Sequence, residues 1–139
     1  MASSTTFLEA GERHHRDALH LEADGRDANA DQLYGLAAEC AVKALLLGLC
    51  GIAMRDDAPV RPYRQHINEL WPLAAGMVTG LTAVHHTGSL LAANPFAGWS
   101  VNDRYAGHGP IDPVGLDAHQ KASASLVSGA QLARLDGLL

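Results

Sequence analysis

NADQLYGLAAECAVKALLLGLCG, residues 29–51, is the stretch of sequence that decides the fold. Its apolar residues occupy almost the whole circumference of a helix, and the polar side chains of Gln32, Glu39 and Lys43 form one narrow ridge. A helix at the surface of a protein shows a single apolar stripe, so a helix that is apolar on nearly all sides must be enclosed by neighbours. We expect this stretch to be the central helix of a compact bundle.

The composition indicates one soluble domain. A chain of 139 residues has the size of a single ordinary domain, and its 15 acidic against 10 basic side chains argue against binding nucleic acid by charge alone. The N-terminus lacks the apolar run of a signal peptide, and no eighteen apolar residues occur in succession. Cys40 and Cys50 lie too far apart on the central helix for a disulfide, which fits a reducing compartment. We therefore expect a cytoplasmic protein with no membrane segment.

Helix signals divide the rest of the chain. Thr6 and Glu9 fit a capping box, Gly51 stands where a helix would end in a left-handed residue, and Asp112 can cap a last helix that begins at Pro113. The short turn at residues 24–26 predicts that the first two helices are antiparallel, with Asp27 or Asn29 as the second cap. The expected helices cover residues 7–23, 28–50, 63–78, 79–92 and 113–137.

Prolines and glycines mark the interruptions. Pro72 falls inside the third expected helix, where it should cause a kink or a break. Residues 52–63 read as a loop, and the Gly- and Pro-rich residues 94–112 as a second loop, which its aromatic residues should hold against the core. No run alternates apolar and polar residues over the length of a strand. The predicted fold is therefore all-α, an up-and-down bundle of four or five helices in one domain, residues 1–139.

Arg104 and His108, in the stretch NDRYAGHG, are the candidate catalytic pair. An arginine can hold a phosphate through two parallel hydrogen bonds, and a histidine can move a proton near neutral pH. Together they could orient and cleave a phosphodiester that uses its own 2′-hydroxyl as nucleophile. The alternative is that Arg104 anchors the loop by bonding carbonyl groups and that His108 is simply exposed.

Glu39, Lys43, His66 and Tyr105 are the candidate supporting or substrate-binding residues. Glu39 and Lys43 stand four positions apart, in the order that favours an ion pair on one helix face. That pair either lies on an exposed strip or lines a cleft or a dimer interface. His66, at an expected helix start, could approach Glu39 within the bundle.

No metal site and no cofactor are expected. His85 and His86 have no carboxylate or cysteine at ligand spacing, and the two cysteines do not form a C-x-x-C motif. The sequence also lacks the signatures of phosphate-loop enzymes, dinucleotide enzymes and serine hydrolases.

The pattern AAECAVKALL, after a charged first helix and an Asp-Ala-Asn entry, resembles the HEPN superfamily of small bacterial helical proteins. YRQHINELW is similar to the following helix of that family, and WSVNDRYAGHG to the segment before its final long helix. The resemblance covers roughly residues 8–135. It implies a four- or five-helix bundle that forms a homodimer, with the active cleft where the two subunits meet.

The resemblance also implies a function. Many relatives are metal-independent ribonucleases of toxin or defence systems, which use an arginine followed by a histidine near the start of the last helix. Arg104 and His108 are the match to that pair here, in a degenerate form, because only three residues separate them and glycines flank His108. We therefore expect an RNA- or nucleotide-directed component of a bacterial defence or toxin–antitoxin system, either an endoribonuclease or a degenerate relative.

Two alternatives belong to other classes of protein. The first is a non-catalytic dimeric module that docks a partner enzyme encoded nearby, such as a nucleotidyltransferase. The second is a small-ligand binder with a pocket between Trp71, Trp99 and Tyr105.

Overall fold

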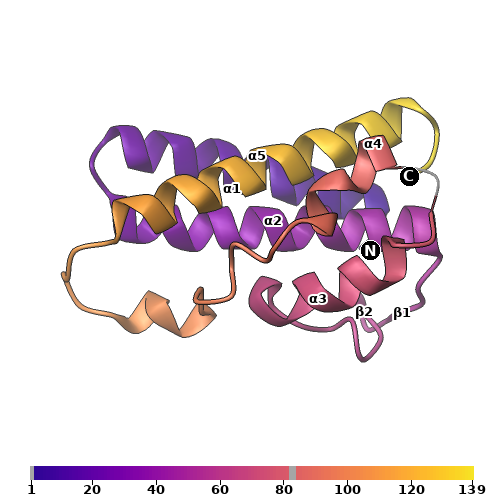
Figure 1. Ribbon diagram of the computed structural model, residues 1–139, viewed down its shortest axis with the longest axis horizontal. Coiled ribbons are helices and arrows are strands. Elements are labelled where there is room, and N and C mark those ends of the chain that lie inside the picture. Colours follow the sequence, from indigo (N-terminus) through magenta and orange to yellow (C-terminus); the bar gives the residue numbers. More distant parts are fainter. Residues whose placement is uncertain (1, 82–83) are drawn as a thin grey trace.

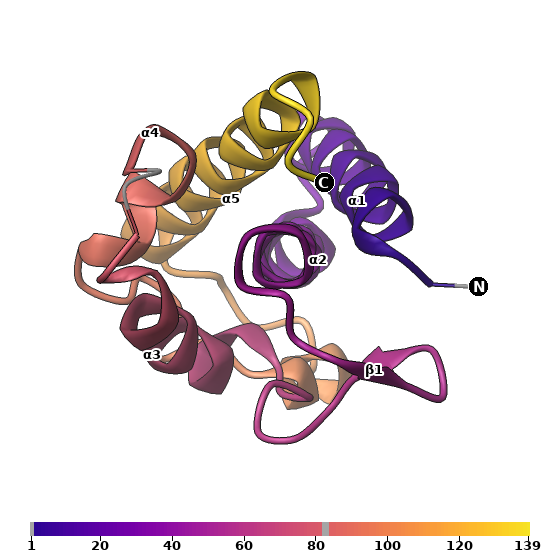
Figure 2. The same ribbon diagram turned by 90° about the vertical axis from the view of Figure 1, so that its right-hand side faces the viewer.

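Helix α2 (Asp27–Cys50) lies at the centre of the computed structural model, which describes residues 2–81 and 84–139. Helices α1 (Ser4–Ala23), α3 (Ile67–Val78) and α5 (Pro113–Leu135) surround it, as the view along its axis shows (Figure 2). The predicted all-α bundle and its central helix are thereby confirmed. The buried residues of α2 point to all sides: Ala30, Gln32, Tyr34, Gly35, Ala37, Ala38, Glu39, Ala41, Val42, Ala44, Leu45 and Leu46.

The apolar character of α2 is that of a core helix. By length and composition alone it could cross a membrane, since an 18-residue window of it has a mean hydropathy of 1.6. However, 56% of that window is buried inside the protein. Enclosure by the other helices accounts for the apolar surface, which fits a soluble protein.

The first two helices are antiparallel, as predicted, and they pack closely (Figure 1). A Cβ atom at Gly11 of α1 would lie 3.2 Å from the carbonyl oxygen of Ala37, so a glycine allows the two backbones to approach. Gly51 ends α2 with a φ of 62°, in the left-handed conformation expected there. Helices α3 and α5 run in the same direction as α2, because long connections return the chain between them (Figures 1 and 2).

Two of the predicted helix caps are wrong. Ser3, and not Thr6, caps α1: its side chain accepts from the Thr6 backbone N–H, and the Thr6 hydroxyl accepts from the Ser3 N–H. At α2 the cap is Arg26, which makes no capping hydrogen bond, and Asp27 lies in the first turn. The last helix begins as predicted, with the Asp112 carboxylate accepting from the backbone N–H groups of the first turn.

Helix α3 continues through Pro72 without a break. Proline has no N–H, so the carbonyl oxygen of Asn68, four residues earlier, lacks its usual helical donor. The side-chain amide of Asn94 supplies the missing hydrogen bond, with Nδ2 donating to that oxygen over 3.0 Å. A residue from the following loop therefore repairs the helix and ties the loop to it.

The regions on either side of α3 differ from the prediction. Helix α3 starts at Ile67 rather than at residue 63, and residues 52–63 contain a small hairpin, β1 (Met54–Arg55) and β2 (Ala58–Pro59). The helix expected over residues 79–92 is not continuous: a short α4 (Val84–Thr87) is followed by a 3₁₀ turn over Gly88–Leu91. Residues 82 and 83 of that expected helix lie outside the described residues.

The long loop between residues 94 and 112 packs onto the bundle, as expected. Phe96 and Trp99 are buried, and the indole Nε1 of Trp99 donates to the carbonyl oxygen of Asp31 on α2. A Cβ atom at Gly35 would overlap the Trp99 ring, so a glycine on α2 makes the seat for this side chain. Tyr105, at the end of a 3₁₀ turn over Val101–Tyr105, is 75% exposed instead.

The Asn94 repair leads to a prediction on stability. Replacing Asn94 by Ala should lower the free energy of unfolding by about 1–2 kcal/mol, because the Asn68 carbonyl is left without a donor. In a Pro72→Ala background the helix itself can supply an N–H, so the same replacement should cost at least about 0.5 kcal/mol less. Urea denaturation of the four proteins measures both values, and equal costs in the two backgrounds would contradict the repair.

Candidate functional site

The polar ridge of α2 meets two other segments of the chain rather than solvent. Glu39 is the centre of this contact: its Oε2 accepts from Lys43 Nζ and its Oε1 is bonded to His66 Nδ1, each over 3.0 Å. Gln32, near the start of the helix, donates from Nε2 to the carbonyl oxygen of Ser100 over 2.9 Å. The expected approach of His66 to Glu39 is therefore present, and the Glu39–Lys43 pair is formed.

Burial changes the meaning of the Glu39–Lys43 pair. The side chains are only 10% and 12% exposed, so this is not the exposed ion pair of a solvated helix face. A carboxylate removed from water needs all of its partners, since its desolvation is costly. Lys43 and His66 supply them from the next turn of α2 and from the start of α3.

His66 is held in a defined orientation with one nitrogen open. It occupies the cap position of α3, and its side chain is 51% exposed. The Glu39 carboxylate can only accept, so Nδ1 of the ring carries the hydrogen, which leaves Nε2 of the neutral ring as an acceptor. Among the described residues Nε2 has no hydrogen-bond partner. A buried carboxylate that orients a histidine in this way is the arrangement of a general base.

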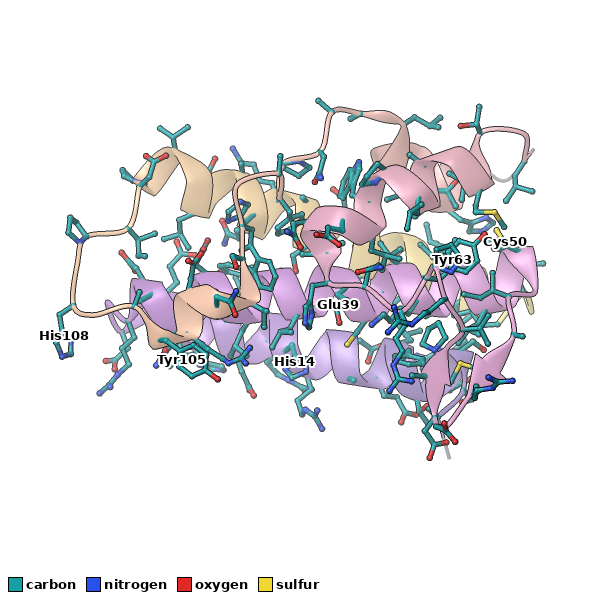
Figure 3. The ribbon with its side chains drawn as sticks, turned by 90° about the horizontal axis from the view of Figure 1, so that it is seen from below. His14, Glu39, Cys50, Tyr63, Tyr105 and His108 are labelled. Carbon is teal, nitrogen blue, oxygen red and sulfur yellow. The ribbon has the colours of Figure 1, made fainter. Side chains whose placement is uncertain are left out.

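His14 of α1 lies near Glu39 of this cluster (Figure 3). Burial is the main cause that lowers the pKa of His14 below 6.5, and Arg13 adds to it. Glu39 acts in the opposite direction, which places the two side chains within electrostatic reach of each other, and both lie in the middle of the molecule in Figure 3.

Cys40, next to Glu39, is not a nucleophile. Burial, reinforced by the nearby Glu39 charge, raises the pKa of its thiol to about 11. The thiolate is the reactive form of cysteine, so this side chain is inert at neutral pH. Cys40 and Cys50 are both free.

Arg104 is bound within its own loop. Its guanidinium donates to the carbonyl oxygen of Val101 over 3.2 Å and to the Tyr105 hydroxyl over 2.9 Å, and it lies 4.6 Å from the centre of the Tyr105 ring. Both side chains are exposed. These are the contacts expected if Arg104 anchors the loop, which was the alternative to a catalytic role. Tyr105 is the side chain that Arg104 contacts directly.

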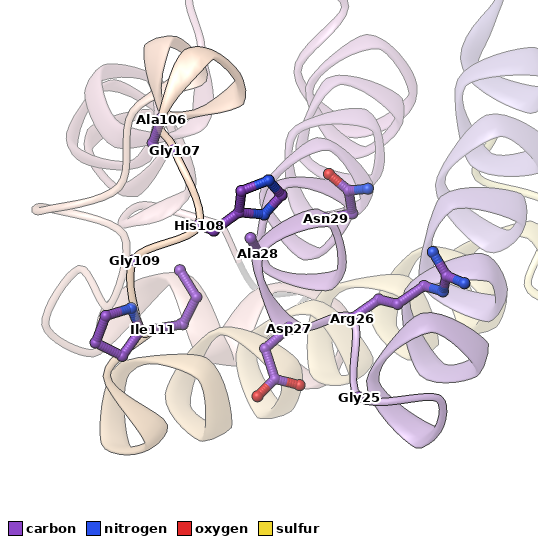
Figure 4. Close-up of a pocket in the computed structure, with 11 residues that line it drawn as sticks. Gly25, Arg26, Asp27, Ala28, Asn29, Ala106, Gly107, His108, Gly109 and Ile111 are labelled. Carbon is purple, nitrogen blue, oxygen red and sulfur yellow. The ribbon is translucent and has the colours of Figure 1, made fainter.

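His108 lines a pocket that Arg104 does not line. It lines a pocket of about 500 Å³ between residues 106–111 and the start of α2, and Figure 4 shows its ring beside the amide of Asn29. The arginine that lines this pocket is Arg26, which is paired with Asp24 over 2.7 Å. No hydrogen bond or ring contact among the described residues joins His108 to Arg104, and a joint role of the two in catalysis stays a prediction.

The third predicted site, a pocket between Trp71, Trp99 and Tyr105, is wrong. Trp71 and Trp99 are 3% and 2% exposed, and both belong to the main hydrophobic core. Tyr105 points to solvent at 75% exposure, so the three rings do not face one cavity.

Sequence reasoning missed a second histidine–carboxylate pair, between His119 of α5 and Asp31 of α2. His119 Nδ1 lies 2.6 Å from Asp31 Oδ1, and Nε2 lies 2.9 Å from the carbonyl oxygen of Pro95. Both ring nitrogens are occupied by these contacts, so neither is open to a ligand. The Phe96 ring stacks on the imidazole at 4.8 Å. This pair fastens the long loop to the bundle.

No group of three potential metal ligands occurs among the residues that the structure describes. Comparisons with protein-family models, curated proteins and solved structures find no match for this chain. The HEPN resemblance therefore stays a prediction, and the case for a function depends on the site itself.

The Glu39 cluster leads to a prediction on stability. Replacing Glu39 by Gln leaves the Lys43 ammonium buried without its counter-charge, and we expect the free energy of unfolding to fall by about 3 kcal/mol. The double replacement Glu39→Gln with Lys43→Met removes the orphaned charge and should recover most of that loss. Urea denaturation measures both variants, and a single variant as stable as the wild type would show that the pair is not buried in solution.

Proposed function

We propose that this chain is an RNA- or nucleotide-directed protein of the HEPN-like type, acting in the cytoplasm without a metal ion, in which His66 is the acid/base group. The observation that carries the proposal is the His66–Glu39 pair. The Glu39 side chain is 10% exposed and fixes Nδ1 of a ring that is 51% exposed. The ring is thus half-exposed, and the buried carboxylate fixes its orientation through Nδ1.

The chemistry follows from that geometry. Nε2 of His66 would take the proton of a ribose 2′-hydroxyl, and the 2′-oxygen would then attack the adjacent phosphorus. The 5′-oxygen leaves and takes a proton from water or from the imidazolium, which gives a 2′,3′-cyclic phosphate and a 5′-hydroxyl. Lys43 donates to the other oxygen of the same carboxylate and so holds Glu39 in position for this role.

In this proposal Arg104 and His108 act across a dimer interface and not at the His66 of their own chain. They lie on an exposed loop at one end of the molecule, where Tyr105 and His108 are seen in Figure 3. In a homodimer this loop would reach the partner copy, where Arg104 would contact a phosphate of the bound strand. A role in bacterial defence or in a toxin–antitoxin pair fits an RNA-directed activity of this kind.

The test is a cleavage assay in the presence of EDTA with a labelled single-stranded RNA. Replacing His66 by Asn keeps a donor for Glu39 but removes the base, and we expect the rate to fall by about 10²–10⁴-fold. Replacing the exposed His20 by Gln is the matched control and should leave the rate unchanged. Detection of the cyclic phosphate at the new 3′ end identifies the reaction.

The opposite pattern would contradict the proposal. If His66→Asn cleaves at the wild-type rate while Arg104→Gln and His108→Gln are inactive, the loop pair carries the chemistry. If the wild-type protein cleaves no RNA, the chain is not a ribonuclease.

A second candidate function is a non-catalytic dimeric module that docks a partner enzyme. It is favoured by two apolar side chains on one face of α5, Leu132 and Leu135, which are 45% and 80% exposed. Residues three apart share a helix face, so these leucines form one apolar strip.

The dimer is tested by light scattering on the eluting peak of a sizing column. We expect a mass of two chains for the wild type and of one chain for the variant with Leu132→Ser and Leu135→Ser, because the strip would no longer be apolar. A matched variant with Ser at the exposed Val114 should remain dimeric. A monomeric wild type would contradict both the dimer and the strip as its interface.

A further inference from the structure

Three arginines line one pocket beside the small hairpin. The pocket has a volume of about 410 Å³, and its lining residues are Arg55, Pro59, Val60, Arg61 and Arg64. No acidic side chain belongs to this lining. The chain as a whole has a net charge of −5, so this segment concentrates positive charge against the general balance.

These three arginines are not used by the fold. Among the described residues, the arginines with an ion pair are Arg26 and Arg134, and Arg104 is bound within its loop. Arg55 and Arg61, like Arg64, are exposed and have no ion pair or side-chain hydrogen bond in the described part of the chain. Like charges that share one pocket repel, and an anion bound between them would relieve that repulsion.

The backbone that carries the arginines is held in place. The hairpin pairs Arg55 with Ala58, and the N–H of Val60 donates to the carbonyl oxygen of Ala53 over 3.0 Å. The Tyr63 hydroxyl then donates to Met77 Sδ of α3 over 3.1 Å. The segment is thus fastened at both ends, at the hairpin and at α3, and Figure 2 shows the hairpin at the side of the bundle.

The nearest carboxylates in the sequence are not part of the pocket lining. Asp56 and Asp57 form the hairpin turn, with φ values of 52° and 59°. Asp57 Oδ1 accepts from the backbone N–H of Ala2 over 3.0 Å, and neither aspartate lines the pocket. The positive charge of the pocket is therefore not neutralised from within its own loop.

We propose that the Arg55–Arg61–Arg64 pocket is a binding site for phosphate groups of a nucleotide or an RNA strand. A guanidinium is always charged and matches a phosphate with two parallel donors, so a cluster of arginines recognises such an anion. Arg64 stands two residues before His66, on the same connection into α3. The inference rests on the proposed function for its ligand class, but it requires no chemistry at His66.

The experiment measures the binding of a fluorescein-labelled oligouridylate by anisotropy over a range of salt concentrations. Replacing Arg61 and Arg64 together by Gln should weaken binding at least tenfold. It should also lower the slope of log K against log salt by about 1.4, because each arginine that no longer binds a phosphate of a single strand reduces the slope by about 0.7. The matched control replaces Arg16 and Lys121 by Gln, which removes the same charge from exposed positions on α1 and α5.

Inorganic triphosphate as a competitor separates the two sources of phosphate. Displacement of the labelled strand indicates a site for the phosphates of a free nucleotide, and binding without displacement indicates a site for the RNA backbone. Both results support the proposal. Equal weakening in the two double variants, or no binding of either probe by the wild type, would overturn it.

This outcome is independent of the cleavage assay. Binding that survives in His66→Asn but is abolished in the arginine variant supports the pocket even if the chain cleaves no RNA. Thermal melting of each variant shows that it is folded, which is expected because these arginines make no contact that the fold uses.

Discussion

The burial of α2 on every side is the constraint on which the rest of the structure depends. Over residues 30–46 no side chain of α2, which α1, α3 and α5 surround, is fully exposed. The buried polar groups of this stretch need partners, since an unpaired polar group in the interior is costly. Gln32 therefore binds the loop at Ser100, Asp31 binds His119, and Glu39 binds the start of α3. The polar ridge thus determines where the loops are fastened.

The same constraint explains how much could be predicted from sequence. The all-round apolar pattern of residues 29–51 specifies a buried helix without reference to its neighbours, and Gly51 specifies its end. The first helix start was misplaced because Ser3 with Thr6 and Thr6 with Glu9 both fit a capping pattern, and only the backbone geometry decides between them. Pro72 was expected to disturb α3, but a side chain 22 residues further on repairs the helix.

In the candidate site, too, some contacts could be predicted from the sequence and others could not. The Glu39–Lys43 pair is local, four residues apart on one helix, and the approach of His66 follows from packing the next helix against it. Asp31 and His119 are 88 residues apart in the sequence. The loop between their helices takes a path that depends on where Trp99 packs against α2. No spacing in the sequence signals such a pair, because it exists only once the loop is packed. Arg104 and His108 are close in sequence, yet their contacts lie in different places.

Burial and hydrogen bonding also distinguish His119 and His86 from His66. A catalytic ring needs an orientation fixed by one nitrogen and access through the other. Both ring nitrogens of His119 contact oxygen atoms of other residues. The side chain of His86, which is bonded to Asp136, is only 2% exposed. His108 is exposed and lines a pocket, but no charged partner among the described residues sets the direction of its ring.

His66 meets both requirements, because its partner Glu39 is itself braced by Lys43 within the core. A carboxylate on a surface loop would orient the ring only weakly, since both side chains would move. Here the carboxylate belongs to the buried central helix, and the ring is half-exposed. The central helix therefore positions the ring of His66 through the same burial that makes Glu39 require partners.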